Sequence, residues 1–362
     1  MLFAQVGILS ITLKLATQKD AHKWNEIVER DPQGNFFDRF EWCQALGLVS
    51  KNIIPLPLII EENEEASGVF PLCLVRQRLF ADLESLPFSD YGGGPFFRRE
   101  DILKQTDFSV RFYNSLIEFG LTNKCIKISI RRAYFPDLIN KATIEKPVII
   151  DTNTCTFLFS LQEGIDQLYQ KVKNSRRRSI RQGEKRGTIV YEAKDLGGLQ
   201  NFYEIYVHSM TRLGTIPLPF SLLDHIWNVF IPKDEAKIFI AEYNNKPMGA
   251  ILLFIYKGVC HAWTGGSLDM YQDKRPMDVL LWHSIKWATT SGLELFDLGS
   301  TPNNPSSGHY FFKESWGGKK VTLYNYHILL QPMKLKFARF GKKILSNIEK
   351  SRMSKKGHAD YG

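Results

Sequence analysis

The residues with the clearest potential for chemistry lie near the end of the chain, between Phe296 and Gly317. Asp297 ends a short apolar run and precedes a polar loop. Lys313 follows two phenylalanines and precedes Trp316, so its ammonium is expected at the rim of an apolar pocket, where a charge acts more strongly than in bulk water. A cation at such a rim could polarise a carbonyl, and a carboxylate could orient or deprotonate a nucleophile such as an amine. Lys313 and Asp297 are therefore the catalytic candidates.

Both candidates also have a structural interpretation. Lys313 could lie on a strand, with its stem packed on aromatic rings and its charge in water. Asp297 could accept hydrogen bonds from the N–H groups of its own loop. Asp297 is expected at the carboxyl end of a buried strand, where the ligands of open α/β sheets collect. A role in orienting the amine is therefore favoured over proton transfer.

A strongly basic segment runs from Lys171 to Arg186, with eight lysines and arginines against one acidic residue. Lys173, Arg177 and Arg181 recur every four residues and so line one face of a predicted helix. Like charges at this spacing repel each other, which favours a face that binds a polyanion, and arginine forks match phosphate oxygens. These three residues are candidate substrate ligands for a nucleotide, a lipid diphosphate or the end of a tRNA. The alternative is a solvated helix face.

Three more polar residues are candidate substrate contacts. Asp90 and Tyr91 precede three consecutive glycines, which allow a ligand to approach the backbone closely and also simply make turns. His309 stands four residues before Lys313, where it is either a base or an ordinary surface histidine.

The elements that must position these residues form a pattern that occurs twice. After a first strand at 11–15, each half is predicted to contain helices, a pair of strands around an acidic or polar turn, a long helix, and a buried strand after a Gly-Leu pair. The predicted ranges are 24–29, 40–46, 56–60, 68 onward, 102–119 and 125–130, and then 199–212, 237–242, 250–256, 277–290 and 293–298. Such a repeat indicates a duplicated domain, with a first domain at 1–150 and a second at 151–330.

Composition excludes several classes of protein. Apolar residues make up 44% of the 362 residues, which is typical of a globular chain. The five cysteines have neither disulfide-framework nor zinc-ligand spacing, so no metal is expected. The first lysine, Lys14, comes after the uncharged N-terminal segment, and no apolar run reaches the roughly 18 residues of a membrane span. A cytoplasmic location is therefore expected.

The tail from residue 331 to 362 differs from the rest of the chain. It carries nine lysines and arginines against two acidic residues, out of a net charge of +9. Apolar residues recur in it at helical spacing: Met333, Phe337, Phe340, Ile344 and Ile348. The pattern predicts a basic amphipathic helix that either contacts the inner face of an anionic membrane through residues 331–356 or packs on the protein.

Several of these stretches resemble the Fem-type aminoacyltransferases, which are built from tandem GNAT-like domains. The resemblance spans roughly residues 36–328 and is closest to the Fem-related proteins of exopolysaccharide and exosortase systems. It places Ser300 and Phe312 among the candidate substrate contacts. The stretches that carry it are Phe296–Ser300, Gly308–Gly317, Ser85–Gly93 and Arg176–Gly187.

The resemblance implies an α/β fold of two tandem GNAT-like domains, each with a mixed central sheet flanked by helices. It also implies transfer of an acyl or aminoacyl group to an amino group of a phosphate-bearing precursor of the cell envelope, such as a peptidoglycan or polysaccharide precursor. The alternatives are an acyl-CoA-dependent N-acetyltransferase and a non-catalytic module that binds a phosphorylated glycan or RNA.

The donor is the least determined part of this interpretation. GNAT enzymes that use acyl-CoA usually hold its pyrophosphate with a glycine-rich loop at a helix N-terminus. The corresponding segment here, Gln272 to Met277, has no glycine, and Pro276 lacks an N–H group. CoA is therefore expected to bind weakly. The donor is either aminoacyl-tRNA or acyl-CoA, and no cofactor is required.

Overall fold

The computed structural model describes residues 10–99, 102–132 and 144–335. The first half of the chain combines short helices with antiparallel strands and ends on a long helix and a strand. Its elements are β1 (Ile11–Leu15), α1 (Ala21–Arg30), α2 (Phe40–Ala45), β2 (Ile53–Glu62), β3 (Glu65–Arg76), β4 (Ala81–Glu84), β5 (Phe96–Phe97), α3 (Thr106–Thr122) and β6 (Cys125–Arg132).

The second half opens on a long strand and returns to it at the end. Its elements are β7 (Val148–Ser160), α4 (Ile165–Lys171), α5 (Asn174–Lys185), β8 (Ile189–Glu192), α6 (Leu196–Arg212), α7 (Phe220–Val229), β9 (Ala236–Tyr243), β10 (Lys246–Tyr256), β11 (Val259–Ser267), the 3₁₀ helix η8 (Asp269–Lys274), α8 (Pro276–Thr290), β12 (Leu295–Asp297), β13 (Thr301–Pro302), α9 (Gly308–Glu314) and β14 (Lys319–Leu329).

All strands of the described ranges belong to one mixed sheet, with the main order β1-β2-β3-β4-β6-β14-β7-β12-β11-β10-β9-β8. Each half contains one parallel pair, β4–β6 in the first and β11–β12 in the second. A long helix lies between the two strands of each pair along the chain, α3 in the first half and α8 in the second. The observed architecture is therefore the predicted one, a mixed α/β fold whose two halves share a pattern.

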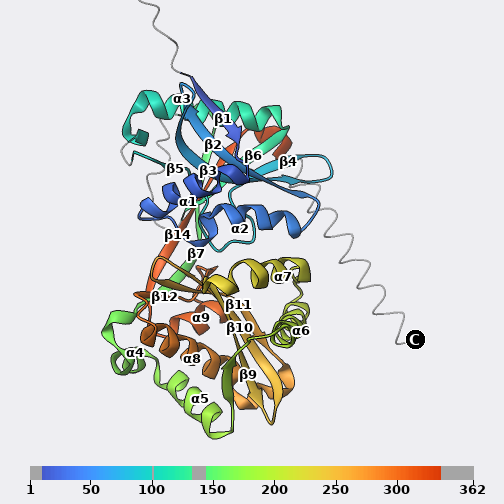
Figure 1. Cartoon of the computed structure of the whole chain (residues 1–362), viewed down its shortest axis with the longest axis vertical. Coiled ribbons are helices and arrows are strands. Elements are labelled where there is room, and N and C mark those ends of the chain that lie inside the picture. Colours follow the sequence, from blue (N-terminus) through green and yellow to red (C-terminus); the bar gives the residue numbers. More distant parts are fainter. Residues whose placement is uncertain (1–9, 100–101, 133–143, 336–362) are drawn as a thin grey trace, which may run out of the picture.

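Two strands connect the halves (Figure 1). β14 pairs antiparallel with β6 on one side and with β7 on the other, so the end of the chain returns to the middle of the sheet. The predicted domain boundary at residue 150 falls inside β7. The division into domains at 1–150 and 151–330 stays a prediction, and the predicted basic helix lies almost entirely outside the described residues.

Most predicted helices and strands overlap observed elements, although the strand predicted at 293–298 is only Leu295–Asp297 and the helix predicted at 102–119 is broken before Thr106. Two further differences are informative. The helix predicted to end at Phe119 continues through Gly120 to Thr122. A Cβ atom at Gly120 would lie 2.6 Å from the Leu330 side chain, so this glycine allows close packing and does not end the helix. Lys313 lies on the helix α9 and not on a strand, which overturns the interpretation of a lysine at the surface of a strand.

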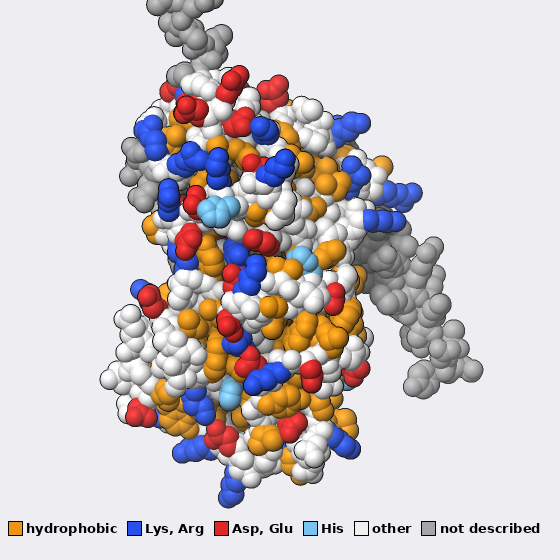
Figure 2. All heavy atoms as spheres, viewed as in Figure 1, with side chains coloured by type: hydrophobic (Ala, Val, Ile, Leu, Met, Phe, Trp, Pro, Cys, Tyr) orange, Lys and Arg blue, Asp and Glu red, His pale blue; other side chains and the backbone are white. Residues whose placement is uncertain are grey.

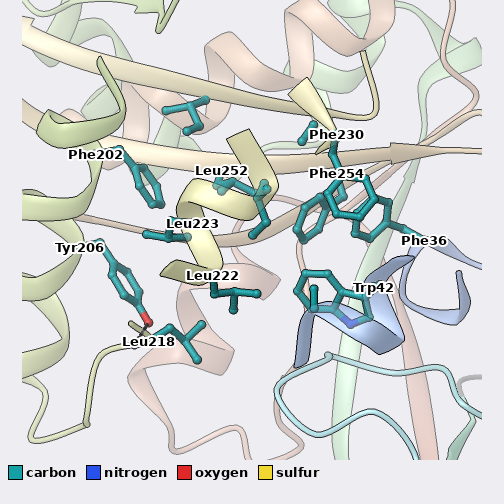
Figure 3. Close-up of a cluster of buried hydrophobic side chains, with 14 of the residues drawn as sticks. Phe36, Trp42, Phe202, Tyr206, Leu218, Leu222, Leu223, Phe230, Leu252 and Phe254 are labelled. Carbon is teal, nitrogen blue, oxygen red and sulfur yellow. Dashed lines mark hydrogen bonds between the residues drawn. The ribbon is translucent and has the colours of Figure 1, made fainter. Parts of the chain in front are cut away.

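A hydrophobic cluster packs the first half of the chain against α6, α7 and β10 of the second (Figure 3). The ring of Phe36 stacks on that of Phe254, with centroids 3.8 Å apart and planes 12° apart. Trp42 on α2 contacts the same Phe254 ring edge-on. Burial of these aromatic side chains brings the segment around residues 32–46 against the strands that carry the site described below.

The charged side chains on the surface and the lengths of the helices are those expected of a globular protein. Basic and acidic side chains are interspersed over both halves of the face seen in Figure 2. Across residues 10–99, 102–132 and 144–335, no helix combines the length and the apolar character that crossing a bilayer demands. All five cysteines are buried and reduced.

Candidate active site

The candidate active site lies where the parallel strands β11 and β12 stop pairing. The strands pair from Val259 with Leu295 to His261 with Asp297. β12 ends there, whereas β11 continues to Ser267. Beyond this point a cavity of about 600 Å³ is lined by the rest of β11, by α6, by the start of α8 and by α9.

A buried charged cluster lies beside this cavity, at the strand residues that precede it, and joins the two halves of the chain. His261 Nε2 lies 2.7 Å from Asp90 Oδ2, and His261 Nδ1 lies 3.1 Å from the Tyr91 hydroxyl. Tyr91 donates to Asp297 Oδ2 over 2.5 Å. Ser300 donates from its hydroxyl to the second oxygen of Asp90 over 2.7 Å. Asp90 and Tyr91 come from the first half, and the other three residues come from the second.

The charges in this cluster support one another. Burial opposes the charge of His261, but Asp297 and Asp90 raise its pKa to about 9. Burial likewise opposes the charge of Asp90, but His261, with Lys313 and Ser300, lowers its pKa to about 2. His261 is therefore an imidazolium at neutral pH, and it donates from both nitrogens. It has no free lone pair, so it orders the cluster and does not act as a base.

Asp297 is fully buried, and it shapes the turn that follows β12. One oxygen accepts from the Gly299 amide over 2.8 Å and contacts the Thr156 hydroxyl. Gly299 has φ of +75°, and a Cβ atom there would lie 2.6 Å from the Ala262 carbonyl oxygen, so only glycine fits this turn. Asp297 thus accepts from the backbone of its own loop, as the structural interpretation predicts, and its role in orienting an amine stays a prediction.

Lys313 connects the turn to the cavity. Its ammonium donates to the carbonyl oxygens of Gly299 and Ser300, over 2.9 and 2.8 Å. An ammonium has three donors, so one remains for a ligand. Burial lowers the pKa of Lys313 below its usual value, against the attraction of Asp90 and Asp297. The side chain lines the cavity, as the sequence predicts for a catalytic electrostatic group.

Two other predicted contacts line the cavity from α9. His309 lies one helical turn before Lys313 and is exposed, so it is accessible to a ligand. The ring of Phe312 lies 4.4 Å from the guanidinium carbon of Arg176. Ser300 does not line the cavity, and its hydroxyl is engaged by Asp90.

The basic helix presents a different face to the cavity from the predicted one. Arg176 lines the cavity, whereas Lys173, Arg177 and Arg181 do not. Lys173 pairs with Glu314 on α9, and Arg177 donates to its own helix at Asn174. The role of these three residues as phosphate ligands stays a prediction. Because their side chains do not line the cavity, it requires a ligand that extends beyond the cavity.

The cavity is nevertheless cationic. Arg212 lines it from α6 and pairs with Asp269 over 3.0 Å. Arg275 lines it just before α8, where it makes no ion pair within the described ranges and is attracted by Asp278. Together with Arg176 and Lys313, these side chains make the cavity suited to an anionic ligand or to negative charge that develops during a reaction.

The described residues contain no group of three or more histidine, cysteine or acidic side chains placed to hold a metal ion. The residues that sequence reasoning missed are His261, Thr156 and Arg176. A histidine in the apolar run of β11 was the available signal, because a buried charge requires partners. Arg176 and Thr156 gave no such signal, since their positions depend on packing between distant segments.

Comparisons with known proteins agree with this geometry. Residues 170–314 match the acetyltransferase (GNAT) domain family. No curated protein sequence gives a significant match. Three solved structures that resemble the whole chain are FemX (TM-score 0.65, 16% identity, 89% of this chain and 98% of FemX), the C-terminal domain of a putative lysylphosphatidylglycerol synthetase from Agrobacterium fabrum (0.57, 13%, 90% and 96%) and a tandem GNAT protein from the clavulanic acid biosynthesis pathway (0.51, 8%, 88% and 98%).

The solved structures establish the fold, and the family match indicates the general class of reaction. The family match covers α5 to α9, and therefore β11, α8, β12 and the cavity between them. The structural likeness extends the same fold to both halves of the chain. The protein is an acyltransferase of the GNAT fold.

Replacing His261 by glutamine should change stability in a pH-dependent way. The pKa of His261 is raised from 6.5 to about 9 in the folded state, so its charge stabilises the fold fully below pH 6.5, and this contribution is lost as pH rises through 9. The quantity to compare is the free energy of unfolding of the parent protein minus that of His261→Gln. This difference should be larger at pH 6 than at pH 10, by on the order of 3 kcal/mol.

Urea unfolding at several pH values measures this difference. His22→Gln is the matched control, because His22 lies on the surface of α1; it should change stability by no more than about 0.5 kcal/mol at any pH. A difference between the parent protein and His261→Gln that does not vary with pH would show that His261 is not charged in the folded protein.

Proposed function

We propose that this acyltransferase moves an aminoacyl group from an ester donor, aminoacyl-tRNA, to an amino group of a phosphate-bearing cell-envelope precursor. The observation that carries the proposal is Lys313, whose ammonium is anchored by two carbonyl oxygens and keeps one donor for the cavity. The likeness to FemX and to a lysylphosphatidylglycerol synthetase supports aminoacyl transfer over simple acetylation.

The reaction uses Lys313 as an electrostatic group. A neutral amine attacks the carbonyl carbon of the ester, a C–N bond forms and the carbonyl oxygen becomes an oxyanion. The remaining donor of Lys313 stabilises this oxyanion, and stabilisation by a preorganised donor accounts for much of the rate enhancement in acyl transfer. The C–O bond then breaks, the amine loses a proton, and the leaving hydroxyl takes one up. His309 is an exposed residue of the cavity wall and is our candidate for exchanging protons with the amine.

The cations of the cavity suit a phosphate-bearing ligand. Arg212 is half exposed at the cavity wall, whereas Arg275, just before α8, makes no ion pair within the described ranges but is attracted by Asp278. Arginine forks bind phosphate oxygens with directed hydrogen bonds. The assignment of the acceptor to a peptidoglycan or exopolysaccharide precursor rests on the Fem-type resemblance, and contact with a membrane through residues 331–356 remains part of the proposal.

An acyl-CoA donor is the second candidate, and the family match to an acetyltransferase domain favours it. The start of α8, where GNAT enzymes bind pyrophosphate, argues against it. Pro276 lacks an N–H group, and the amides of Asp278 and Val279 both donate to the Arg275 carbonyl over 3.2 Å. Few amides are left for a pyrophosphate, so weak CoA binding is expected.

Lys313→Met should lower the transfer rate by about two orders of magnitude or more, the usual scale for removing a preorganised electrostatic group, and should leave the fold intact. Rates of amide formation with aminoacyl-tRNA as donor measure the effect. Lys319→Met, the same change on the exposed start of β14, should keep the parent rate. An unchanged rate in a normally folded Lys313→Met protein would remove Lys313 from the reaction.

Donor choice is tested by binding. The parent protein should bind aminoacyl-tRNA with an affinity that falls steeply as salt rises, and acetyl-CoA only weakly, because a long polyanion releases many counterions. The double variant Arg177→Ala, Arg181→Ala should weaken the tRNA complex and flatten its salt dependence. Gel-shift titrations at two salt concentrations and calorimetry with acetyl-CoA measure these quantities. Micromolar acetyl-CoA binding with productive N-acetylation would establish the second candidate instead.

A further inference from the structure

The start of α8 holds a buried ion pair that the proposed reaction does not use. Asp278 is the third residue of α8 and is only 6% exposed. Its carboxylate bonds the guanidinium of Arg176, which reaches across from α5. Both side chains line the 600 Å³ cavity.

Asp278 puts a carboxylate in the first turn of α8, close to where a helix would attract a ligand anion. The N-terminus of a helix carries partial positive charge and free amides, which favour a bound anion. In α8 the first residue is Pro276, which has no amide hydrogen, and the amides of Asp278 and Val279 bond the Arg275 carbonyl. The Met277 amide alone remains without a partner in the described part of the chain. The start of α8 therefore offers few free amides, and the negative charge in its first turn comes from Asp278.

Arg176 is held in a fixed position toward that carboxylate. Its Nε donates to the Ser315 hydroxyl over 3.1 Å, and its guanidinium lies over the Phe312 ring. A phosphate arriving at the start of α8 would compete with Asp278 for Arg176 and would face a negative charge in a partly buried setting. Repulsion between like charges is strong there, because the surroundings screen it less than bulk water does.

We propose that Asp278 is a specificity determinant, which excludes donors with a pyrophosphate, such as CoA, from the start of α8. The inference rests on the proposed function, in which the donor is an ester without a pyrophosphate. It adds the residue that selects against pyrophosphate. The missing glycine and Pro276 only reduce the number of N–H groups that could bind a pyrophosphate, whereas Asp278 supplies a repulsive charge and pairs with Arg176.

The test is the affinity for coenzyme A of the full chain and of Asp278→Asn, measured by calorimetry. Asparagine keeps the shape of the side chain, removes its charge and releases Arg176. Asp278→Asn should bind coenzyme A at least about tenfold more tightly than the parent protein. Pantetheine, which has the same arm without phosphates, should bind the two proteins equally. Asp278→Ser is a second variant in case asparagine disturbs the helix, and melting curves confirm that each protein is folded.

Asp269→Asn is the matched control. It removes a carboxylate that also pairs with a cavity arginine, Arg212, but it lies on η8 and is half exposed. It should leave the affinity for coenzyme A within about twofold of the parent value. The same gain in Asp269→Asn would show that net charge and not position decides the affinity, and would overturn the proposal.

Failure of this inference differs from failure of the proposed function. Weak coenzyme A binding that stays unchanged in folded Asp278→Asn and Asp278→Ser overturns the role of Asp278 and leaves the aminoacyl donor standing. Micromolar binding of coenzyme A by the parent protein, with acetyl transfer, overturns both.

Discussion

A buried imidazolium between two carboxylates joins the two halves of the chain beside the candidate active site. His261 on β11 faces Asp90 from the first half of the chain on one side, and Tyr91 and Asp297 on the other. Charges removed from water are tolerated only when they are paired and hydrogen-bonded, and removing one partner of such a group is strongly destabilising. The two halves can therefore meet in only one relative position at this point, and the stacked rings of Phe36 and Phe254 fix the same contact through apolar packing.

The chemistry of the cavity depends on this cluster although the cluster itself does not react. Asp297 holds the Gly299 amide, the turn from Gly299 to Ser300 presents two carbonyl oxygens, and those oxygens hold the ammonium of Lys313. Each of these contacts fixes the position of the next group, so the remaining N–H donor of Lys313 is oriented before any substrate binds. A donor that needs no reorganisation during the reaction is the most effective kind of electrostatic catalyst. In the proposed reaction the first half acts through Asp90 and Tyr91, which do not themselves line the cavity that Lys313 faces.

The sequence predicted the fold better than the details of the site, for physical reasons. Periodicity and turn residues located β1, α8 and most other elements, because those signals are local. Lys313, Asp297, Asp90 and Tyr91 were found because they stand beside glycines and aromatic residues in recognisable stretches, and the structure brings all four together. Arg176 was missed in favour of Arg177, because the face of α5 that meets α8 is decided by packing. The sequence did not indicate that Lys313 lies on a helix, because α9 has only seven residues and is too short to show a helical hydrophobic periodicity.

The central claim is that acyl transfer takes place in the cavity beside Lys313. A crystal structure with a 3′-aminoacylamido-adenosine, a stable analogue of the end of aminoacyl-tRNA, tests it most directly. The account predicts that the amide carbonyl oxygen lies within about 3 Å of Lys313 Nζ, the range of a charge-assisted hydrogen bond, with the analogue between β11 and α9. An analogue bound at another surface, with the cavity beside Lys313 unoccupied, would contradict it.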